Sequence, residues 1–213
     1  MKAADLINSI GEELARCSKK CKGIANRPDE GIIPRCLIVE NEPIAVVIAG
    51  INPGKCNRKE REYYLGRQGY TTIKDHWDVR IKGLKYYAAL RKLSKELGYG
   101  DGILWTELVK CENDRNDVAP PLQTFRVCIK NYLERELKAV PEVPIMAVGN
   151  KVFEALSYRF PDRFIIGVPH PTGSYGHFSK LFENGRLKEK YVKAAKESQD
   201  DYGNRNSVKL FPD

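Results

Sequence analysis

The sequence predicts an α/β fold built on a parallel β-sheet. Four short apolar runs have the length of buried strands, and stretches with helical spacing separate them along the chain. A helix between successive strands carries the chain back across the sheet, so the strands come to lie parallel. The four predicted strands are residues 44–49, 103–109, 144–148 and 164–168. Ligands of such sheets bind at the carboxyl ends of the strands.

Length and charge narrow the class of protein. A chain of 213 residues can bury a full core, and we expect a single domain over residues 1–198 followed by a polar tail over residues 199–213. The 36 Lys and Arg residues outnumber 28 Asp and Glu residues, a net charge of +8 that favours a polyanionic partner. No apolar stretch has the length of a signal core or membrane span, so we expect a cytoplasmic protein without a membrane partner. We also expect a monomer.

Two loops that follow predicted strands carry candidate site residues. The first strand leads into residues 50–54, Gly-Ile-Asn-Pro-Gly, and the fourth leads into residues 170–173, His-Pro-Thr-Gly. Turns rich in glycine and proline after buried strands present polar side chains at the edge of a sheet. His170 alone fits an ordinary turn residue better than a catalyst, but the matching strand ends favour a shared site. Glu107 and Asn150 fall at the ends of the other two strands.

Six cysteines in an intracellular chain favour metal or core roles over disulfides. Cys17 and Cys21 continue an apolar helical stripe from Ile10, so we expect both thiols on one face of an N-terminal helix. Cys111 follows the second strand, and Cys128 lies on a later helical stripe. These cysteines are either small apolar core residues or thiolate ligands of zinc or an iron–sulfur cluster.

Residues 55–67 interleave basic and aromatic side chains directly after the first loop. Lys55 begins the segment, Tyr63 and Tyr64 lie within it, and Tyr70 lies just beyond it. Such a pattern can hold phosphates and stack a nucleobase. A solvated helix that packs its tyrosines inward is an equally good interpretation.

These motifs together resemble those of the uracil-DNA glycosylase superfamily. Residues 50–54 are similar to the first motif of its mismatch-specific and single-strand-selective branches, and residues 170–173 resemble the second motif. Residues 106–111, Thr-Glu-Leu-Val-Lys-Cys, followed by Cys128, instead resemble the iron–sulfur branch, which also opens with a helix and a cysteine pair. The resemblance spans roughly residues 14–178.

The resemblance implies a three-layer α/β sandwich in which helices flank a four-stranded parallel sheet. It also implies a structural four-iron, four-sulfur cluster, with zinc as the alternative metal. The ligands would be the four cysteines Cys17, Cys21, Cys111 and Cys128.

The activity implied is that of a monofunctional DNA glycosylase, which hydrolyses the N-glycosidic bond of a flipped pyrimidine in double- or single-stranded DNA. His170 would donate to the base carbonyl as negative charge grows on the departing base. Asn52 would position the attacking water. The other implied residues bind the base (Ile51, Tyr64, Tyr70 and Glu107) or DNA (Lys55, with Tyr175, His177 and Phe178 forming a wedge).

Glu107 departs from the pattern, because the iron–sulfur families usually place an asparagine there to read uracil. An ionised glutamate can only accept hydrogen bonds, so it would repel the C4 carbonyl of uracil and accept from the amino group of cytosine. We therefore hypothesise a cytosine-derived or modified base as substrate. The alternatives are a protonated Glu107, or a Glu107 that points away from the base.

Two other classes of function stay open at this point. A non-catalytic, cluster-bearing DNA-binding module would bind DNA without releasing base. A metal-dependent nuclease or nucleotide enzyme is disfavoured, because the sequence lacks a Walker-type glycine loop and a convincing carboxylate and histidine constellation.

Overall fold

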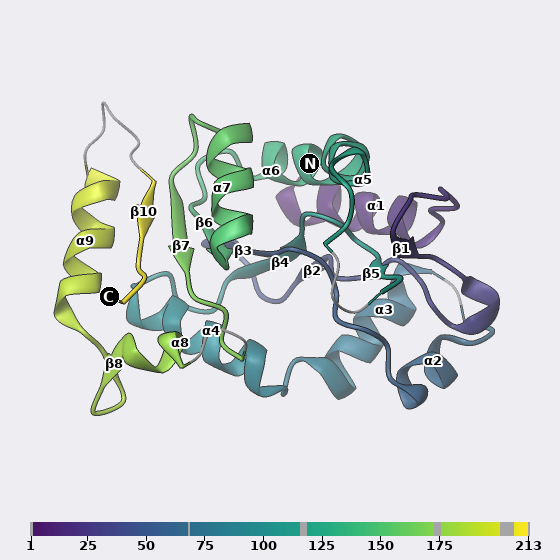
Figure 1. The fold of residues 1–213 in the computed structure, drawn as a ribbon, viewed down its shortest axis with the longest axis horizontal. Coiled ribbons are helices and arrows are strands. Elements are labelled where there is room, and N and C mark those ends of the chain that lie inside the picture. Colours follow the sequence, from purple (N-terminus) through teal and green to yellow (C-terminus); the bar gives the residue numbers. More distant parts are fainter. Residues whose placement is uncertain (1, 68, 116–118, 173–175, 201–206, 213) are drawn as a thin grey trace. The chain divides into compact units, whose positions relative to one another are not determined.

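The main sheet has six strands, in the order β10-β7-β6-β3-β4-β2 (Figure 1). A computed structural model describes residues 2–67, 69–115, 119–172, 176–200 and 207–212. The strands are β2 (Ile38–Val39), β3 (Val46–Gly50), β4 (Ile103–Glu107), β6 (Ile145–Val148), β7 (Ile165–Val168) and β10 (Val208–Lys209). Helices flank the sheet, so the predicted α/β sandwich is confirmed. The two extra strands, β2 and β10, have two residues each and give no recognisable sequence pattern.

The strand pairs β3–β6, β6–β7 and β7–β10 are parallel. Met146 of β6 is in register with Ile48 of β3 and with Ile166 of β7. Every residue of β3, β4, β6 and β7 is buried. Strands covered on both faces read as continuous apolar runs, which is why the sequence predicts these four strands.

α-Helices precede the sheet and separate its successive strands from β3 onward. They are α1 (Ala3–Ala15), α2 (Arg58–Tyr64), α3 (Tyr70–His76), α4 (Lys85–Glu96), α5 (Leu122–Cys128), α6 (Glu134–Ala139), α7 (Asn150–Arg159), α8 (His177–Lys180) and α9 (Glu189–Asp200). Short strands form two small pairs, β1 (Ile24–Ala25) with β5 (Glu112–Asn113) and β8 (Phe182–Glu183) with β9 (Arg186–Leu187). None of the helices in the described part of the chain combines the length and the apolarity that a membrane span requires.

The chain divides into two compact units. The first unit comprises Met1–Val39, Ile51–Ile81 and Trp105–Val140, and the second comprises Glu40–Gly50, Lys82–Leu104 and Pro141–Asp213. All six cysteines and residues 51–54 of the first motif loop belong to the first unit, whereas His170 belongs to the second.

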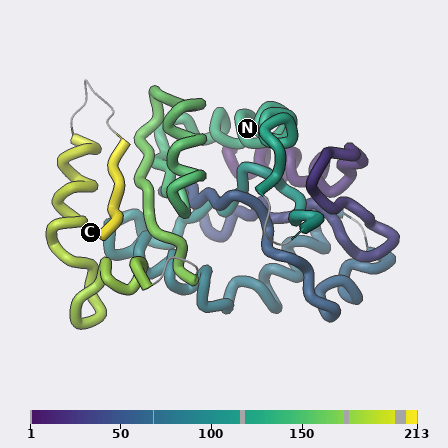
Figure 2. The backbone as a smooth tube through the Cα atoms, in the orientation of Figure 1, coloured from purple at the N-terminus to yellow at the C-terminus, as the bar shows by residue number. Residues whose placement is uncertain are grey.

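The first unit packs α1 against α3 and α6. Figure 2 shows α1, at the purple end of the chain, beside the teal α6. Ile7 and Ile10 of α1 are fully buried. The ring of Tyr70 lies against Gly11, where an added Cβ would come within 2.6 Å of the ring, and its hydroxyl donates to the carbonyl oxygen of Leu37 at 2.8 Å. Tyr70 therefore holds α3 against α1.

The predicted continuation of the N-terminal helix through Cys21 is wrong. Helix α1 ends at Ala15, and residues 17–21 form no helix. The side-chain amide of Asn26 donates to the carbonyl oxygen of Cys17 at 2.6 Å, which satisfies an acceptor that a further helical turn would otherwise use. Cys17 and Cys21 consequently lie on a loop.

The second unit packs α7 on β6 and β7. Phe153 of α7 covers Gly167, where a Cβ would come within 2.6 Å of the ring. Residues 199–213 are predicted as a polar tail, but Val208 and Lys209 form β10 beside β7, and Leu210 is fully buried. This part of the tail is therefore integrated into the sheet.

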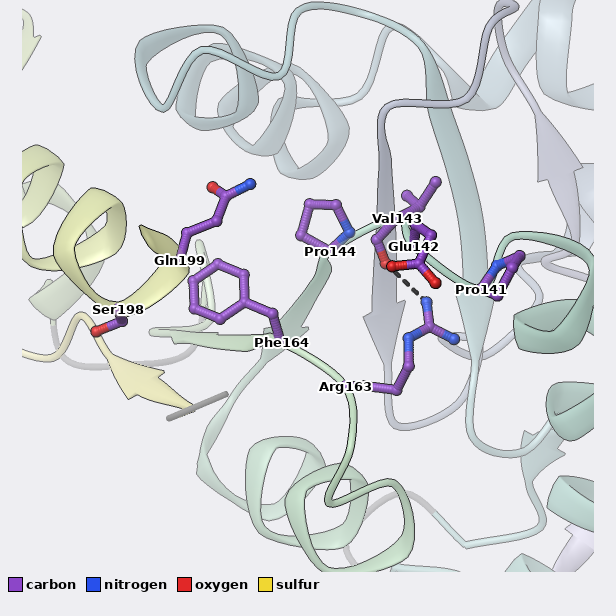
Figure 3. Close-up of a pocket in the computed structure, with 8 residues that line it drawn as sticks. All are labelled: Pro141, Glu142, Val143, Pro144, Arg163, Phe164, Ser198 and Gln199. Atoms are coloured by element: carbon purple, nitrogen blue, oxygen red, sulfur yellow. Dashed lines mark hydrogen bonds between the residues drawn. The ribbon is translucent and has the colours of Figure 1, made fainter. Parts of the chain in front are cut away.

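A pocket lies at the amino ends of β6 and β7 (Figure 3). Nη2 of Arg163 donates to the carbonyl oxygen of Val143 across it at 2.7 Å. His170 follows the carboxyl end of β7, so this pocket lies at the opposite end of that strand from the histidine loop. Its lining residues are Pro141, Glu142, Val143, Pro144, Arg163, Phe164, Ser198 and Gln199.

Candidate active site

The first motif loop leaves the carboxyl end of β3 and is fixed by the segment that follows β4. The backbone N–H of Val109 donates to the carbonyl oxygen of Ile51 at 3.0 Å. Nδ2 of the half-buried Asn52 donates to the carbonyl oxygen of Pro53 at 3.1 Å. The amide nitrogen is thus used within the loop, and the carboxamide oxygen is the group of Asn52 that can accept a hydrogen bond from water.

Arg35 anchors this loop from a part of the chain in which the sequence shows no motif. Its guanidinium donates to the carbonyl oxygen of Gly54 and forms ion pairs with Glu60 and Glu112, each at 3.1 Å. Arg35 is 5 % exposed. Burial opposes its charge, while Glu60 and the other neighbouring anionic groups raise its pKa. One cation therefore joins the motif loop, α2 and the segment after Cys111.

Replacing Arg35 by alanine is expected to lower the free energy of unfolding by about 3–5 kcal/mol, because it removes the buried cation that pairs with both Glu60 and Glu112. Chemical denaturation of the purified variant measures this. The matched control is Arg58→Ala, which removes an ion pair to Glu62 whose arginine is 92 % exposed, and should cost less than about 1 kcal/mol. Equal effects of the two substitutions would contradict the anchoring role of Arg35.

Glu107 ends β4 and is the most unusual carboxyl group of the first unit. It is 7 % exposed, and its Oε2 is buried without a hydrogen-bond partner. Burial raises the pKa of Glu107 to about 8, against the opposing influence of Lys110 and Arg35. Burial also raises the pKa of nearby Cys36 to about 12, and the charge of Glu107 adds to this rise. Cys36 has a left-handed backbone with φ of 65°.

A buried triad lies next to Glu107. Nζ of Lys110 donates to Thr106 Oγ1 and pairs with Glu136 Oε2 at 2.8 Å, and both charged side chains are fully buried. The Thr106 hydroxyl donates to the same carboxylate at 2.5 Å. The triad fixes the turn that runs from Glu107 to Cys111.

The three tyrosines predicted as base-stacking candidates differ in exposure. Tyr64 and Tyr70 are 2 % and 3 % exposed, so neither offers a ring face to a base in this conformation. Tyr63 is half-buried, with the guanidinium carbon of Arg67 4.5 Å from its ring centroid and the His76 ring at the same distance. Tyr63 is therefore the candidate among the three with accessible ring surface.

The second motif loop places His170 directly after β7. Nδ1 of His170 accepts from the backbone N–H of Thr172 at 3.3 Å, and the Thr172 hydroxyl lies at the same distance. A neutral imidazole with Nδ1 as acceptor carries its proton on Nε2. Burial lowers the pKa of His170, which favours this neutral form. The Tyr86 ring, in the first turn of α4, packs 5.1 Å from the imidazole between centroids.

The other predicted DNA contacts have different surroundings. Lys55 is exposed, and His177 is half-buried at the start of α8. Phe178 is 7 % exposed and packs 5.6 Å from the ring of Phe182, so in this structure it is a core residue of the second unit rather than an exposed wedge. Tyr175 lies outside the described residues.

Asn150, the polar residue at the end of β6, is occupied structurally. Its Nδ2 donates to Glu154 at 2.6 Å, and its Oδ1 accepts from Lys209 at 2.8 Å. Both ends of the Asn150 carboxamide are therefore used in hydrogen bonds, whereas in Asn52 the amide nitrogen is used within its loop.

The four predicted ligand cysteines line one cavity, the cysteine cavity. The cysteines are Cys17, Cys21, Cys111 and Cys128. The remaining wall is largely apolar, with Leu14, Ile24, Val109 and Val127 among its residues. The backbone N–H of Lys110 donates to Sγ of Cys128 at 3.3 Å. Cys36 and Cys56 do not line this cavity.

The thiols of the cysteine cavity influence one another. Burial raises the pKa of Cys111, and the sulfur atoms of Cys128, Cys17 and Cys21 raise it further. Among the described residues, no three or more histidine, cysteine, aspartate or glutamate side chains converge closely enough to surround a single metal ion. Four thiols around one cavity, without convergence on one point, are therefore the donor set that the first unit offers.

Three residues that contact the candidate site residues or their loops are not predicted as such from the sequence. They are Arg35, Tyr86 and Thr172. The partners of Arg35 lie far along the chain, and Tyr86 belongs to a helix whose apolar stripe predicts only packing. Thr172 is part of the motif, but its bond to Nδ1 of His170 depends on the turn geometry.

These features define an α/β protein with polar loops at the carboxyl ends of buried strands. The chain matches the model of the uracil DNA glycosylase superfamily over residues 39–196, well over half its length, and it belongs to that superfamily. The matched region includes Asn52, Glu107 and His170, whereas Cys17 and Cys21 precede it. Members of the superfamily are typically DNA glycosylases, hydrolases of base-excision repair. No curated protein matches the sequence.

Proposed function

We propose that the protein is a monofunctional DNA glycosylase that hydrolyses the N-glycosidic bond of a flipped pyrimidine, either uracil or a cytosine-derived modified base. It would act on double- or single-stranded DNA as a cytoplasmic monomer. The observation that carries this proposal is the hydrogen bond from the backbone N–H of Thr172 to Nδ1 of His170, because a neutral imidazole that accepts at Nδ1 carries its proton on Nε2.

His170 would supply the hydrogen bond that strengthens during the reaction. As the glycosidic bond breaks, negative charge develops on the departing base, and a fixed donor stabilises this charge more than it stabilises the ground state. The Nε2–H group of a neutral imidazole can donate to a base carbonyl. Thr172 and the Tyr86 ring restrict the rotation of the imidazole, so little reorganisation is needed at the moment of reaction.

Asn52 would orient the attacking water through its carboxamide oxygen. Its amide nitrogen is held by Pro53, which fixes the plane of the side chain. An amide does not accept a proton near neutral pH, so Asn52 is no general base. This suits a reaction in which bond breaking precedes attack on a cationic sugar, because such a sugar needs little activation of the water.

The cysteine cavity would hold a four-iron, four-sulfur cluster, with zinc as the alternative. In the cluster each thiolate binds a different iron atom, so the four sulfurs stand farther apart than around one zinc ion, where each Zn–S bond is about 2.3 Å. Thiols that share a cavity without converging on one point fit the cluster better. Its contribution would be structural, joining the loop after α1 to the segment after β4 and to α5.

Asn52→Ala separates a glycosylase from a non-catalytic DNA-binding module. We expect this variant to bind DNA as the wild type does but to release base about a hundredfold more slowly, because the water loses its orientation. Fluorescence anisotropy and single-turnover base release measure the two properties. The matched control is Asn150→Ala, whose carboxamide is bonded to Glu154 and Lys209, and which should release base at the wild-type rate. DNA binding with no base release by the wild type would favour the binding module.

A further inference from the structure

Glu107 is a buried carboxyl group for which the structure provides no counterion. It is 7 % exposed, its Oε2 has no hydrogen-bond partner, and none of the ion pairs among the described residues includes it. A buried polar atom without a partner costs free energy, so such an atom at the end of a parallel strand marks a place where a ligand can bond. The segment after Glu107 also holds the first motif loop, through the bond from Val109 to Ile51.

The two cations near Glu107 are already committed to other carboxylates. Arg35 is paired with Glu60 and Glu112, and the fully buried Lys110 is paired with Glu136. The remaining titratable neighbour, Cys36, carries no positive charge in any state. An ionised Glu107 would therefore add an unmatched negative charge to a buried network, which is strongly unfavourable.

We propose that Glu107 works as an uncharged carboxylic acid that reads the ring edge of the flipped base, and that its ionisation changes which base is accepted. This inference rests on the proposed glycosylase function. The rise in the pKa of Glu107 to about 8 through burial is consistent with it.

An uncharged carboxyl group has one donor and one acceptor, as a carboxamide has. It can donate to the C4 carbonyl of uracil while its own carbonyl oxygen accepts from N3–H of the same base. Ionisation removes the donor, and two acceptor oxygens then face the C4 carbonyl. A pyrimidine with an amino group at C4 still offers a donor to the ionised form. Uracil is therefore a substrate of the neutral form, and amino-bearing pyrimidines remain substrates of the ionised form.

The protonation state can be tested without activity by comparing the wild type with Glu107→Gln, which keeps the shape of the neutral acid. A folded-state pKa above the ordinary 4.5 means that the wild type loses stability as the pH rises from that value to about 8, and no further above it. The glutamine variant lacks this loss. The difference in Tm between the two proteins should therefore widen through that window.

A Tm difference that stays constant through this pH window would overturn the proposal that Glu107 is uncharged. If the variant fails to fold, the carboxyl ¹³C resonance of Glu107 in the labelled wild type gives the same answer. A resonance that titrates near the ordinary glutamate pKa would then contradict the inference.

The role of Glu107 in recognising the base is tested by single-turnover base release from single-stranded DNA that contains uracil or an amino-bearing pyrimidine. One pH unit above its pKa only about a tenth of a carboxyl group stays neutral, so uracil release by the wild type should fall roughly tenfold between about pH 7 and about pH 9. Uracil release by Glu107→Gln, whatever its rate, should not change with pH over that range, because glutamine does not ionise. Release of the amino-bearing base by the wild type should not fall.

Parallel uracil profiles for wild type and Glu107→Gln would overturn the reading role. Release of no base at any pH would overturn the proposed function itself, and the Tm comparison would then still decide the charge of Glu107. The two failures are therefore distinguishable.

Discussion

Replacing His170 by alanine is expected to slow base release by roughly a hundredfold to a thousandfold, the usual effect of losing one donor to a developing negative charge. The structure gives the reason, because Nδ1 is occupied by Thr172 and the proton therefore resides on Nε2. Single-turnover release from DNA, at enzyme concentrations that saturate binding, measures the effect on the chemical step.

A second variant that keeps a hydrogen-bond donor at position 170 distinguishes an effect on the chemical step from an effect on folding. His170→Gln keeps an amide N–H and should fall between the wild type and His170→Ala in rate. Tm and DNA affinity should stay close to those of the wild type in both variants, since His170 is only half-buried. A rate within about fivefold of the wild type for His170→Ala, against the loss expected for a lost donor, would show that His170 is only a turn residue.

Cys128→Ser is expected to abolish most of the bound iron and to lower Tm by more than about 10 °C, because metal binding at a structural site contributes directly to folding. Cys128 lies in the wall of the cysteine cavity, and its sulfur also accepts the backbone N–H of Lys110. Elemental analysis of the purified protein and its visible absorption identify the metal. Detection of zinc in place of iron would show that the cavity holds the alternative metal and not a cluster.

Cys56→Ser is the matched control for this experiment. Cys56 is a buried free cysteine of the same unit, but it lies outside the cysteine cavity. We expect it to keep the metal content of the wild type. Equal metal content in Cys128→Ser and Cys56→Ser would show that the cavity holds no metal through Cys128.

The parts of the fold that the sequence predicts are those determined by local pattern. Buried strands produce continuous apolar runs, so the run over residues 103–109 locates β4 at Ile103–Glu107. The two-residue strands β2 and β10 depend on their neighbours and have no such pattern. The same limit explains the error at Cys21: the spacing suits a helix, but α1 ends at Ala15 and the carbonyl oxygen of Cys17 instead accepts from the distant Asn26.

In the candidate site too, local pattern is visible in the sequence and long-range contacts are not. Asn52 and His170 are proposed from sequence because glycine and proline mark the loops that carry them. The anchoring by Arg35 depends on carboxylates distant in sequence. The raised pKa of Glu107 is likewise a long-range effect, because it follows from burial by the fold and because Lys110 is already paired with Glu136. Charge pairing between distant segments has no signature in a single sequence.

The most direct measurement is mass spectrometry of the products from DNA oligonucleotides that contain uracil or a modified cytosine, incubated with the protein without added divalent metal ions. We expect a free pyrimidine base and an intact strand with an abasic site, formed by the wild type and strongly reduced in His170→Ala and Asn52→Ala. Recovery of every base still attached to its sugar, or base release unaffected by both substitutions, would contradict the assignment of these loops to glycosidic bond cleavage.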